Sequence, residues 1–529
     1  MVAMAQVHGE FPVNDDWAYV KAVQRALADG QLHVPDWAGM NFVVHLLWGM
    51  LFGWLYEPSF MVLRLAGLTA GWLGCWVSFR LFRALGADGG FAFVCSATLA
   101  SNPLYFGLST SYMTDVPFLA CTMGALWAYV HALQHNKPWA AVWGTLLAIL
   151  AILIRQVGLA IPLAYAMAVL VARGRGAWRS ALLAPCAAVL AHRTWVAWMQ
   201  HHQHLPANYD AQVHQLRDNL QQPLVLLWDA LGRGATYALY VGLCVLIPML
   251  VMWLTRSQSK RHWRWMALLF LGGLLFLGMQ RMGWRMPLIP SQVALDGLGP
   301  ALERPPLTHL LWRGWSLLTW LSCVSLLATL HMSWRLWQQL RLAQTSWSER
   351  GCAALLVAFT SIYMLPLLGI NTHFDRYVLP CGIAALGLLC MTSAGLQWRR
   401  SYAALAGCCV LAGTLFAGAV AHDYFALQRV RWQLLDWLVV EQGISPRRIQ
   451  GGFEFNGWAL FDARQLKPGA KGWWVHDDEF LVGISPRPGY ALMQARQIPV
   501  WLPFSPSQLQ VLQRLPTTQD GGPGRSDRP

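Results

Sequence analysis

Long apolar stretches separated by short polar loops repeat along the first four-fifths of the chain. A helix needs about 20 apolar residues to cross the hydrocarbon core of a membrane. By this criterion we expect about twelve spans, near 58–83, 88–108, 115–134, 138–154, 157–172, 179–198, 230–254, 265–279, 309–331, 352–370, 377–397 and 402–421. The pattern predicts a mainly α, polytopic helical membrane protein with a transmembrane domain over residues 58–421.

The region before these spans has a different pattern. Apolar positions fall on one side of residues 15–28, which predicts a short amphipathic helix that begins after Asn14 and ends at Gly30. Residues 40–56 are apolar but short, so we expect them to lie in the interface or to re-enter the membrane. We interpret residues 1–57 as a first outer loop with juxtamembrane helices.

The pattern changes again after the last predicted span. A helix-like stretch leads into segments that alternate apolar and polar residues, and such alternation predicts strands. These segments lie near 447–455, 472–485 and 489–502. We expect a small C-terminal α/β domain outside the membrane over residues 422–515. Residues 516–529 are polar and rich in Gly and Pro, so we expect a disordered tail.

Charge gives the predicted bundle an orientation. Only 12% of the residues are charged, whereas soluble proteins carry about 25%. The net charge of +14 therefore indicates basic cytoplasmic loops and no nucleic-acid partner. The basic groups fall on one side of the predicted spans, at 80–83, 173–179, 255–264, 335–350 and 397–400. The first outer loop and the C-terminal domain then lie on the opposite side, and we expect a leading transmembrane helix to be missing before that loop.

Two adjacent acids, Asp15 and Asp16, stand in the motif PVNDDWAY. Carboxylates beside hydrocarbon are costly, so they are candidates for function. One interpretation is a general base whose pKa is raised by its like-charged neighbour. The alternative is helix capping, since acids in a first turn stabilise a helix by roughly 0.3–1 kcal/mol. Asp115, in SYMTDVPF, begins a later span, and capping explains it equally well.

Two further motifs carry basic residues to the same outer side. Arg155 interrupts an apolar run, where it either snorkels at a helix end or binds an anion such as phosphate. The motif HFDRYVLP gathers His373, Asp375, Arg376 and Tyr377 before a late span, and its alternative role is an interfacial anchor with an Asp–Arg pair. The sequence HDDE at 476–479 is better explained as an acidic surface turn than as a metal site.

The ordered set of motifs resembles the GT-C superfamily of polyprenyl-phosphate-sugar glycosyltransferases. The likeness is to the protein O-mannosyltransferase and aminoarabinose transferase type, which is called family 39-like. Those proteins carry an acidic pair followed by an aromatic residue in the first outer loop. Here Asp15, Asp16 and Tyr19 fill these positions, with Asp in place of the usual Glu. A second acid in the second outer loop is matched by Asp115.

The later part of the resemblance concerns basic residues. Family members carry a basic residue before a glycine after the fifth helix, commonly lysine, and here the position is Arg155. They also carry a late Arg-Tyr-x-Leu-Pro, matched by Arg376, Tyr377 and Pro380. The resemblance implies a GT-C fold in which Arg155, Arg376 and Tyr377 bind the phosphate of the donor.

The resemblance also implies a reaction. The enzyme would move a sugar from a polyprenyl-phosphate donor to a hydroxyl of a lipid, glycan or protein acceptor, with inversion. Asp15 would be the base. Asp16 and Asp115 would tune Asp15, hold the acceptor or bind a divalent cation, and the sequence leaves these roles open.

Tyr19, His373 and Asp375 would line the acceptor side of the cavity. The implied location is a bacterial inner membrane, with the active site and the C-terminal domain on the periplasmic side. Two other classes remain open from sequence: a transporter or flippase of a lipid-linked glycan, and a non-catalytic membrane scaffold.

Overall fold

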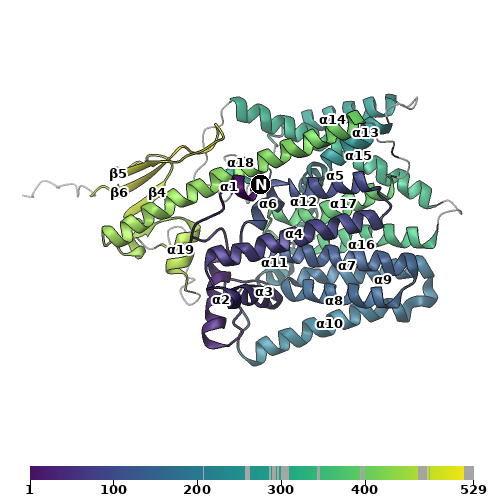
Figure 1. Ribbon diagram of the computed structural model, residues 1–529, viewed down its shortest axis with the longest axis horizontal. Coiled ribbons are helices and arrows are strands. Elements are labelled where there is room, and N and C mark those ends of the chain that lie inside the picture. The colour runs from purple at the N-terminus through teal and green to yellow at the C-terminus, as the bar shows by residue number, and fades with distance from the viewer. Residues whose placement is uncertain are drawn as a thin grey trace, which may run out of the picture.

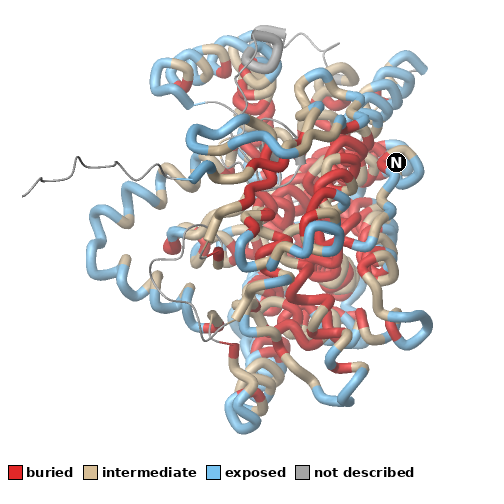
Figure 2. Tube along the Cα trace, turned by 90° about the vertical axis from the view of Figure 1, so that its left-hand side faces the viewer, coloured by how far each residue is buried: buried red, intermediate tan, exposed pale blue. Residues whose placement is uncertain are grey.

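The chain folds into a bundle of helices with a small sheet at one end (Figure 1). The computed structural model describes residues 1–206, 208–256, 262–284, 288, 293–294, 297–298, 309–341, 346–393, 396, 400–462, 474–475 and 477–516. The protein is mainly α, as the sequence predicts. Buried segments gather in the middle of the bundle, and exposed segments lie at its periphery (Figure 2).

Several helices in the described part of the chain are long and apolar enough to cross a membrane. Six helices meet this test, or up to eight spans if each bent pair of helices is one span. The six are α4 (Phe60–Ala84), α7 (Asp115–His135), η1 with α9 (Gln156–Arg173), Arg313–Leu340 within α15 (His309–Leu340), α16 (Trp347–Gly369) and α18 with η4 (Arg400–Glu441). Large apolar side chains such as Trp72, Leu183 and Leu224 are exposed on the outside of the bundle, as expected of helices in lipid.

The remaining helices are shorter, bent or more polar. The bent pairs are α5 (Gly89–Ala100) with α6 (Pro103–Ser109), and α12 (Pro223–Cys244) with α13 (Leu246–Arg256). The others are α1 (Val2–Ala5), α2 (Asp16–Asp29), α3 (Val43–Leu55), α8 (Pro138–Ile154), α10 (Trp178–His201), α11 (Ala211–Leu220), α14 (His262–Arg281) and α17 (Leu379–Met391). The expected total of about twelve spans stays a prediction.

Two predicted spans are broken helices. The stretch near 88–108 bends by 64° between α5 and α6. The side chain of Asn102 accepts a hydrogen bond from the backbone N–H of Leu104, and Pro103 follows as the first residue of α6, so a new helix starts there. The stretch near 230–254 bends by 59° between α12 and α13, where Pro248 cannot donate to the preceding turn.

Hydrogen bonds identify the two ends of the bundle. Arg173 donates to the side chain of Asn136 at 2.6 Å, and Gln134 donates to the carbonyl of Ala84 at 2.7 Å. The C-terminal ends of α4, α7 and α9 therefore lie together, with their basic residues. The start of α7 and the end of α8 lie at the other end, the end that carries α2 and the sheet (Figure 1).

The C-terminal region forms a four-stranded sheet of order β3-β4-β6-β5. The strands are β3 (Ile449–Gln450), β4 (Phe480–Gly483), β5 (Tyr490–Gln497) and β6 (Gln508–Arg514). β3 pairs with β4 in parallel, whereas β6 runs antiparallel to both of its neighbours. The apolar face of this sheet packs against the end of α18 and against η4. Leu434, Leu438 and Val511 belong to the shared core.

The sequence prediction for this domain was correct in type and wrong in detail. The segment 447–455 forms only the two residues of β3 before the chain enters α19 (Phe453–Leu460), and β6 was not predicted. Asp477 and Asp478 form ion pairs with Arg514, which supports the acidic-turn interpretation of that motif. His476 and the predicted tail after residue 516 lie outside the described residues.

Candidate functional site

Asp15 lies directly before α2 and turns away from the helix that it precedes. It is the N-cap of α2, a position that the sequence assigned to Asn14, but its side chain makes no capping bond. One carboxylate oxygen accepts a hydrogen bond from the indole N–H of Trp37 at 2.8 Å. The other lies 3.6 Å from Nη2 of Arg376. Burial raises the pKa of Asp15, and Arg376 opposes this rise.

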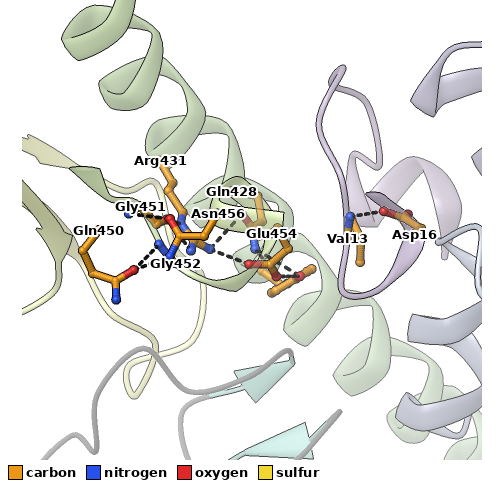
Figure 3. Close-up of polar contacts among 10 residues, drawn as sticks. Val13, Asp16, Gln428, Arg431, Gln450, Gly451, Gly452, Glu454 and Asn456 are labelled. Atoms are coloured by element: carbon orange, nitrogen blue, oxygen red, sulfur yellow. Dashed lines mark hydrogen bonds and ion pairs between the residues drawn. The ribbon is translucent and has the colours of Figure 1, made fainter. Parts of the chain in front are cut away.

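Asp16 points in a different direction from Asp15. It is buried, and its carboxylate accepts hydrogen bonds from the backbone N–H groups of Val13 at 2.6 Å and Tyr112 at 3.3 Å. Figure 3 shows the contact with Val13. Burial raises the pKa of Asp16 to about 8, although Arg64 opposes this rise. Asp16 is therefore packed against the backbone of Val13 and Tyr112, and its carboxylate does not lie beside that of Asp15.

Asp115 and Arg155 form a buried pair that joins α7 to α8. Asp115 is in the first turn of α7, and Arg155 is the C-cap of α8. Nη1 and Nη2 of Arg155 lie 2.9 and 3.0 Å from the two oxygens of Asp115, and Nε donates to Oγ1 of Thr114 at 2.9 Å. This bidentate geometry fixes the guanidinium plane and leaves each terminal nitrogen a second N–H.

Arg376 lies between the two acids. It is 6% exposed, and its Nε is 3.6 Å from Asp115 while Nη2 is 3.6 Å from Asp15. The guanidinium carbon lies 4.0 Å from the centre of the Phe374 ring. The guanidinium makes no hydrogen bond with a residue that the structure describes, and its Nε is among the buried atoms without such a partner. A buried cation in this state is an incomplete anion site.

These groups line one cavity of about 400 Å³, called the site cavity below. Its charged and phenolic wall is formed by Asp15, Tyr19, Arg155, Arg376 and Tyr377. The other lining residues are Trp37, Gly39, Met40, Gln156, Val157, Asn208, Ala211, Gln212, Gln215, Tyr363, Leu367, Thr372 and Phe374. The volume is in the range of small-molecule sites.

Four of the predicted site residues lie outside the site cavity. Asp16 faces the packing below, and Asp115 lies behind Arg155. Asp375 is buried and accepts a hydrogen bond from the backbone N–H of Arg376 at 2.8 Å. His373 lines a different cavity, of about 640 Å³, beside α12.

Trp37 is a part of the site that the sequence did not indicate. Its ring lies 5.8 Å from that of Trp17, 5.7 Å from Phe461 and 5.3 Å from Trp474. An aromatic cluster from α2, from its following loop and from the C-terminal domain therefore holds the indole that donates to Asp15. No local sequence pattern predicts this aromatic cluster, because its contacts join residues that are far apart in sequence.

The cavity's amides come mainly from α11 and the turn before it, a segment that the sequence did not indicate as part of the site. Gln212 and Gln215 are three residues apart on α11, which puts them on one side of that helix, and Asn208 lies in the turn before it. Among the described residues, no group of three or more His, Cys, Asp or Glu side chains is arranged to hold a metal ion. The divalent cation considered for Asp16 and Asp115 stays a prediction.

In chemical terms, the site cavity combines two guanidinium groups with one carboxylate, which lies 3.6 Å from the guanidinium of Arg376. The guanidinium groups suit a phosphate, which they bind through paired N–H donors. The carboxylate, with a pKa raised by burial, suits proton abstraction. Anion binding and proton transfer can thus take place within one small volume.

The sequence matches no protein-family profile and no curated protein. Among solved structures, it is similar to the crystal structure of ArnT from Cupriavidus metallidurans in the apo state, with a TM-score of 0.41. It is also similar to the crystal structure of that protein bound to undecaprenyl phosphate, with a TM-score of 0.47. Each match has 12% sequence identity and covers 97% of this chain and 96% of the other. The evidence for function is therefore the arrangement of side chains in the site cavity.

Proposed function

We propose that this protein is a membrane glycosyltransferase that moves a sugar from a polyprenyl-phosphate donor to a hydroxyl group of an acceptor. The observation that carries the proposal is the state of Arg376. Its guanidinium is buried, lines the site cavity, and lacks hydrogen bonds to the described residues while lying 3.6 Å from Asp15. A phosphate would supply the missing acceptors.

The donor phosphate is bound by Arg376 and Arg155 in this proposal. Arg155 is held in place by Asp115 and Thr114, so its remaining N–H groups have a fixed direction. Tyr377 lies between them, with the guanidinium carbons of Arg155 and Arg376 at 5.9 and 5.8 Å from its ring centre. Rigid, buried donors of this kind stabilise charge that develops on a leaving phosphate.

Asp15 is the general base. It takes the proton of the acceptor hydroxyl, and the acceptor oxygen attacks the anomeric carbon. The bond between that carbon and the phosphate oxygen breaks, and its electron pair stays on the departing polyprenyl phosphate. A single displacement of this kind inverts the anomeric centre. The hydrogen bond from Trp37 fixes one oxygen of Asp15 and leaves the other beside Arg376.

The reaction takes place at the end of the bundle that carries α2 and the sheet (Figure 1). The proposal puts this end on the periplasmic side of a bacterial inner membrane. The basic residues at the opposite ends of α4 and α9 favour that orientation, because such residues favour the cytoplasm. The acceptor is a lipid, glycan or protein whose hydroxyl reaches Asp15 from this side.

The test is release of polyprenyl phosphate from a radiolabelled polyprenyl-phosphate sugar by the purified protein in lipid nanodiscs. Asp15→Asn should lower the rate by about 10²–10⁴, which is the range expected for loss of a general base. Asp36→Asn is the matched control, because Asp36 is an exposed acid in the same loop and does not line the site cavity. A folded Asp15→Asn protein with full activity would remove the base from the mechanism.

Donor binding gives a second arm of the test. Arg376→Ala should weaken binding of the donor, whereas Arg25→Ala should not, because Arg25 is 66% exposed and pairs with Asp29. Movement of an intact lipid-linked sugar across the bilayer, without release of polyprenyl phosphate, would instead identify a flippase.

A further inference from the structure

We infer that the donor sugar is an uncharged, hydroxyl-rich sugar, and that the amide groups of Gln212 and Gln215 on α11 select it. This inference rests on the proposed function. It concerns the part of the site cavity's wall that is lined by neutral polar groups, because these groups remain available to the sugar once the phosphate is bound.

That wall is built from neutral polar groups. Gln212, Gln215 and Asn208 line it from the α11 segment, and Gln156 and Thr372 line it from other elements. A side-chain amide has N–H donors and an acceptor oxygen, and a sugar hydroxyl is likewise both a donor and an acceptor. Several amides on one wall can therefore hydrogen-bond to several hydroxyls of a sugar. None of these five side chains carries a charge.

Two of these amides are each fixed by a hydrogen bond within the protein and still have groups free to hydrogen-bond a ligand. Gln156 donates its N–H to the carbonyl of Gly39 at 2.9 Å, which leaves its own oxygen free to accept. Gln215 accepts from the hydroxyl of Thr372 at 3.2 Å, which leaves its NH₂ group free to donate. Gln212 makes no hydrogen bond with the residues that the structure describes, although it is half-buried and lines the cavity.

The charges of the site cavity oppose a cationic sugar. Asp15 is the acid among the lining residues, and it already contacts Trp37 and Arg376. Arg376 lies 3.6 Å from Asp15 and Arg155 is paired with Asp115, so neither acid is a free counter-ion for an ammonium group, and the amide wall offers none. An amino sugar is therefore disfavoured relative to a neutral sugar of the same size.

The experiment compares binding of matched lipids to the purified protein in nanodiscs. The probes are polyprenyl phosphate alone, a polyprenyl-phosphate hexose, the same lipid with one hydroxyl replaced by an ammonium group, and the corresponding uronic acid. The hexose lipid should bind about tenfold more tightly than polyprenyl phosphate alone, as a few extra hydrogen bonds allow. The amino sugar should gain nothing over polyprenyl phosphate, and neither should the uronic acid, because the phosphate occupies the guanidinium groups that would pair with its carboxylate.

Substitutions separate recognition of the sugar from recognition of the phosphate. Gln212→Ala and Gln215→Ala should each lose most of the sugar-dependent gain and leave the affinity for polyprenyl phosphate unchanged. Gln221→Ala is the matched control, since Gln221 follows α11, is exposed and does not line the cavity. Gln212→Glu should reverse the preference and favour the amino sugar, because it supplies the missing counter-ion.

The outcomes distinguish the inference from the proposed function. Tighter binding of the amino sugar or the uronic acid than of the hexose lipid would overturn the inference and leave the phosphate site standing. An unchanged preference in Gln212→Glu would also overturn it. Failure of polyprenyl phosphate itself to bind would overturn both.

Discussion

Arg376 lies at 3.6 Å from both Asp15 and Asp115, so in the proposed mechanism it would couple donor binding to the protonation of the base. Its positive charge lowers the pKa of Asp15 against the effect of burial. We expect Arg376→Gln to raise the pKa of Asp15. The acid limb of the kcat profile, measured at saturating donor, should then move to higher pH. An unchanged limb would show that the guanidinium does not act on Asp15.

Burial gives Asp16 a part in the pH dependence of stability. Its pKa is about 8 when folded and 3.8 otherwise, so the folded state keeps a proton that the unfolded state loses. Stability therefore falls as the pH rises from about 4 to about 8 and levels off above. Asp16→Asn keeps an oxygen for the N–H of Val13 and should remove this fall, by on the order of 1 kcal/mol or more. Thermal unfolding in detergent at pH 5 and pH 8 measures it.

Helix ends are the elements that build this site, and the pair Asp115–Arg155 joins two of them. The pair is almost completely buried. Asp115→Ala should lower the free energy of unfolding by about 3–5 kcal/mol, because it leaves a buried guanidinium unpaired. Replacing both residues with leucine should restore much of that stability but no activity. Equal stability of Asp115→Ala and the wild type would mean that water enters and solvates Arg155.

Some residues of this site can be predicted from the sequence and others cannot, and the difference again concerns the helix ends. Asp15, Arg155 and Arg376 stand beside helix ends, and the order of apolar runs and basic loops is enough to bring these ends to one face. The amides of α11 and the indole of Trp37 were not predicted as parts of the site, because their positions in it depend on tertiary contacts. The structure places Asp16 outside the site cavity for a related reason. Adjacent residues at a helix start point in different directions, and sequence alone does not say which one faces the cavity.

At the scale of the whole molecule, the C-terminal domain contacts α2 through α19, a helix that a buried ion pair fixes within the domain. Arg431 of α18 pairs with Glu454 of α19 at 3.1 Å and donates to the carbonyl of Gly451, in the cluster shown in Figure 3. Beyond it, Gly457 of α19 packs against Trp17 of α2, and a Cβ atom there would lie 2.4 Å from the indole. The C-terminal domain thus packs against the helix that follows Asp15.

Gly457→Ala tests whether this contact positions the base. The added methyl group must displace Trp17, which lies in the aromatic cluster that holds Trp37 against Asp15. We expect kcat to fall about tenfold, as for a small misplacement of a catalytic group, while the KM for the donor changes little. Gly407→Ala is the matched control, since Gly407 is a helical glycine of α18 with open space around it. Equal kcat values for the two variants would show that the outer domain packs on α2 without setting the geometry of Asp15. A fall in kcat that is confined to Gly457→Ala would show that the C-terminal domain helps to position Asp15.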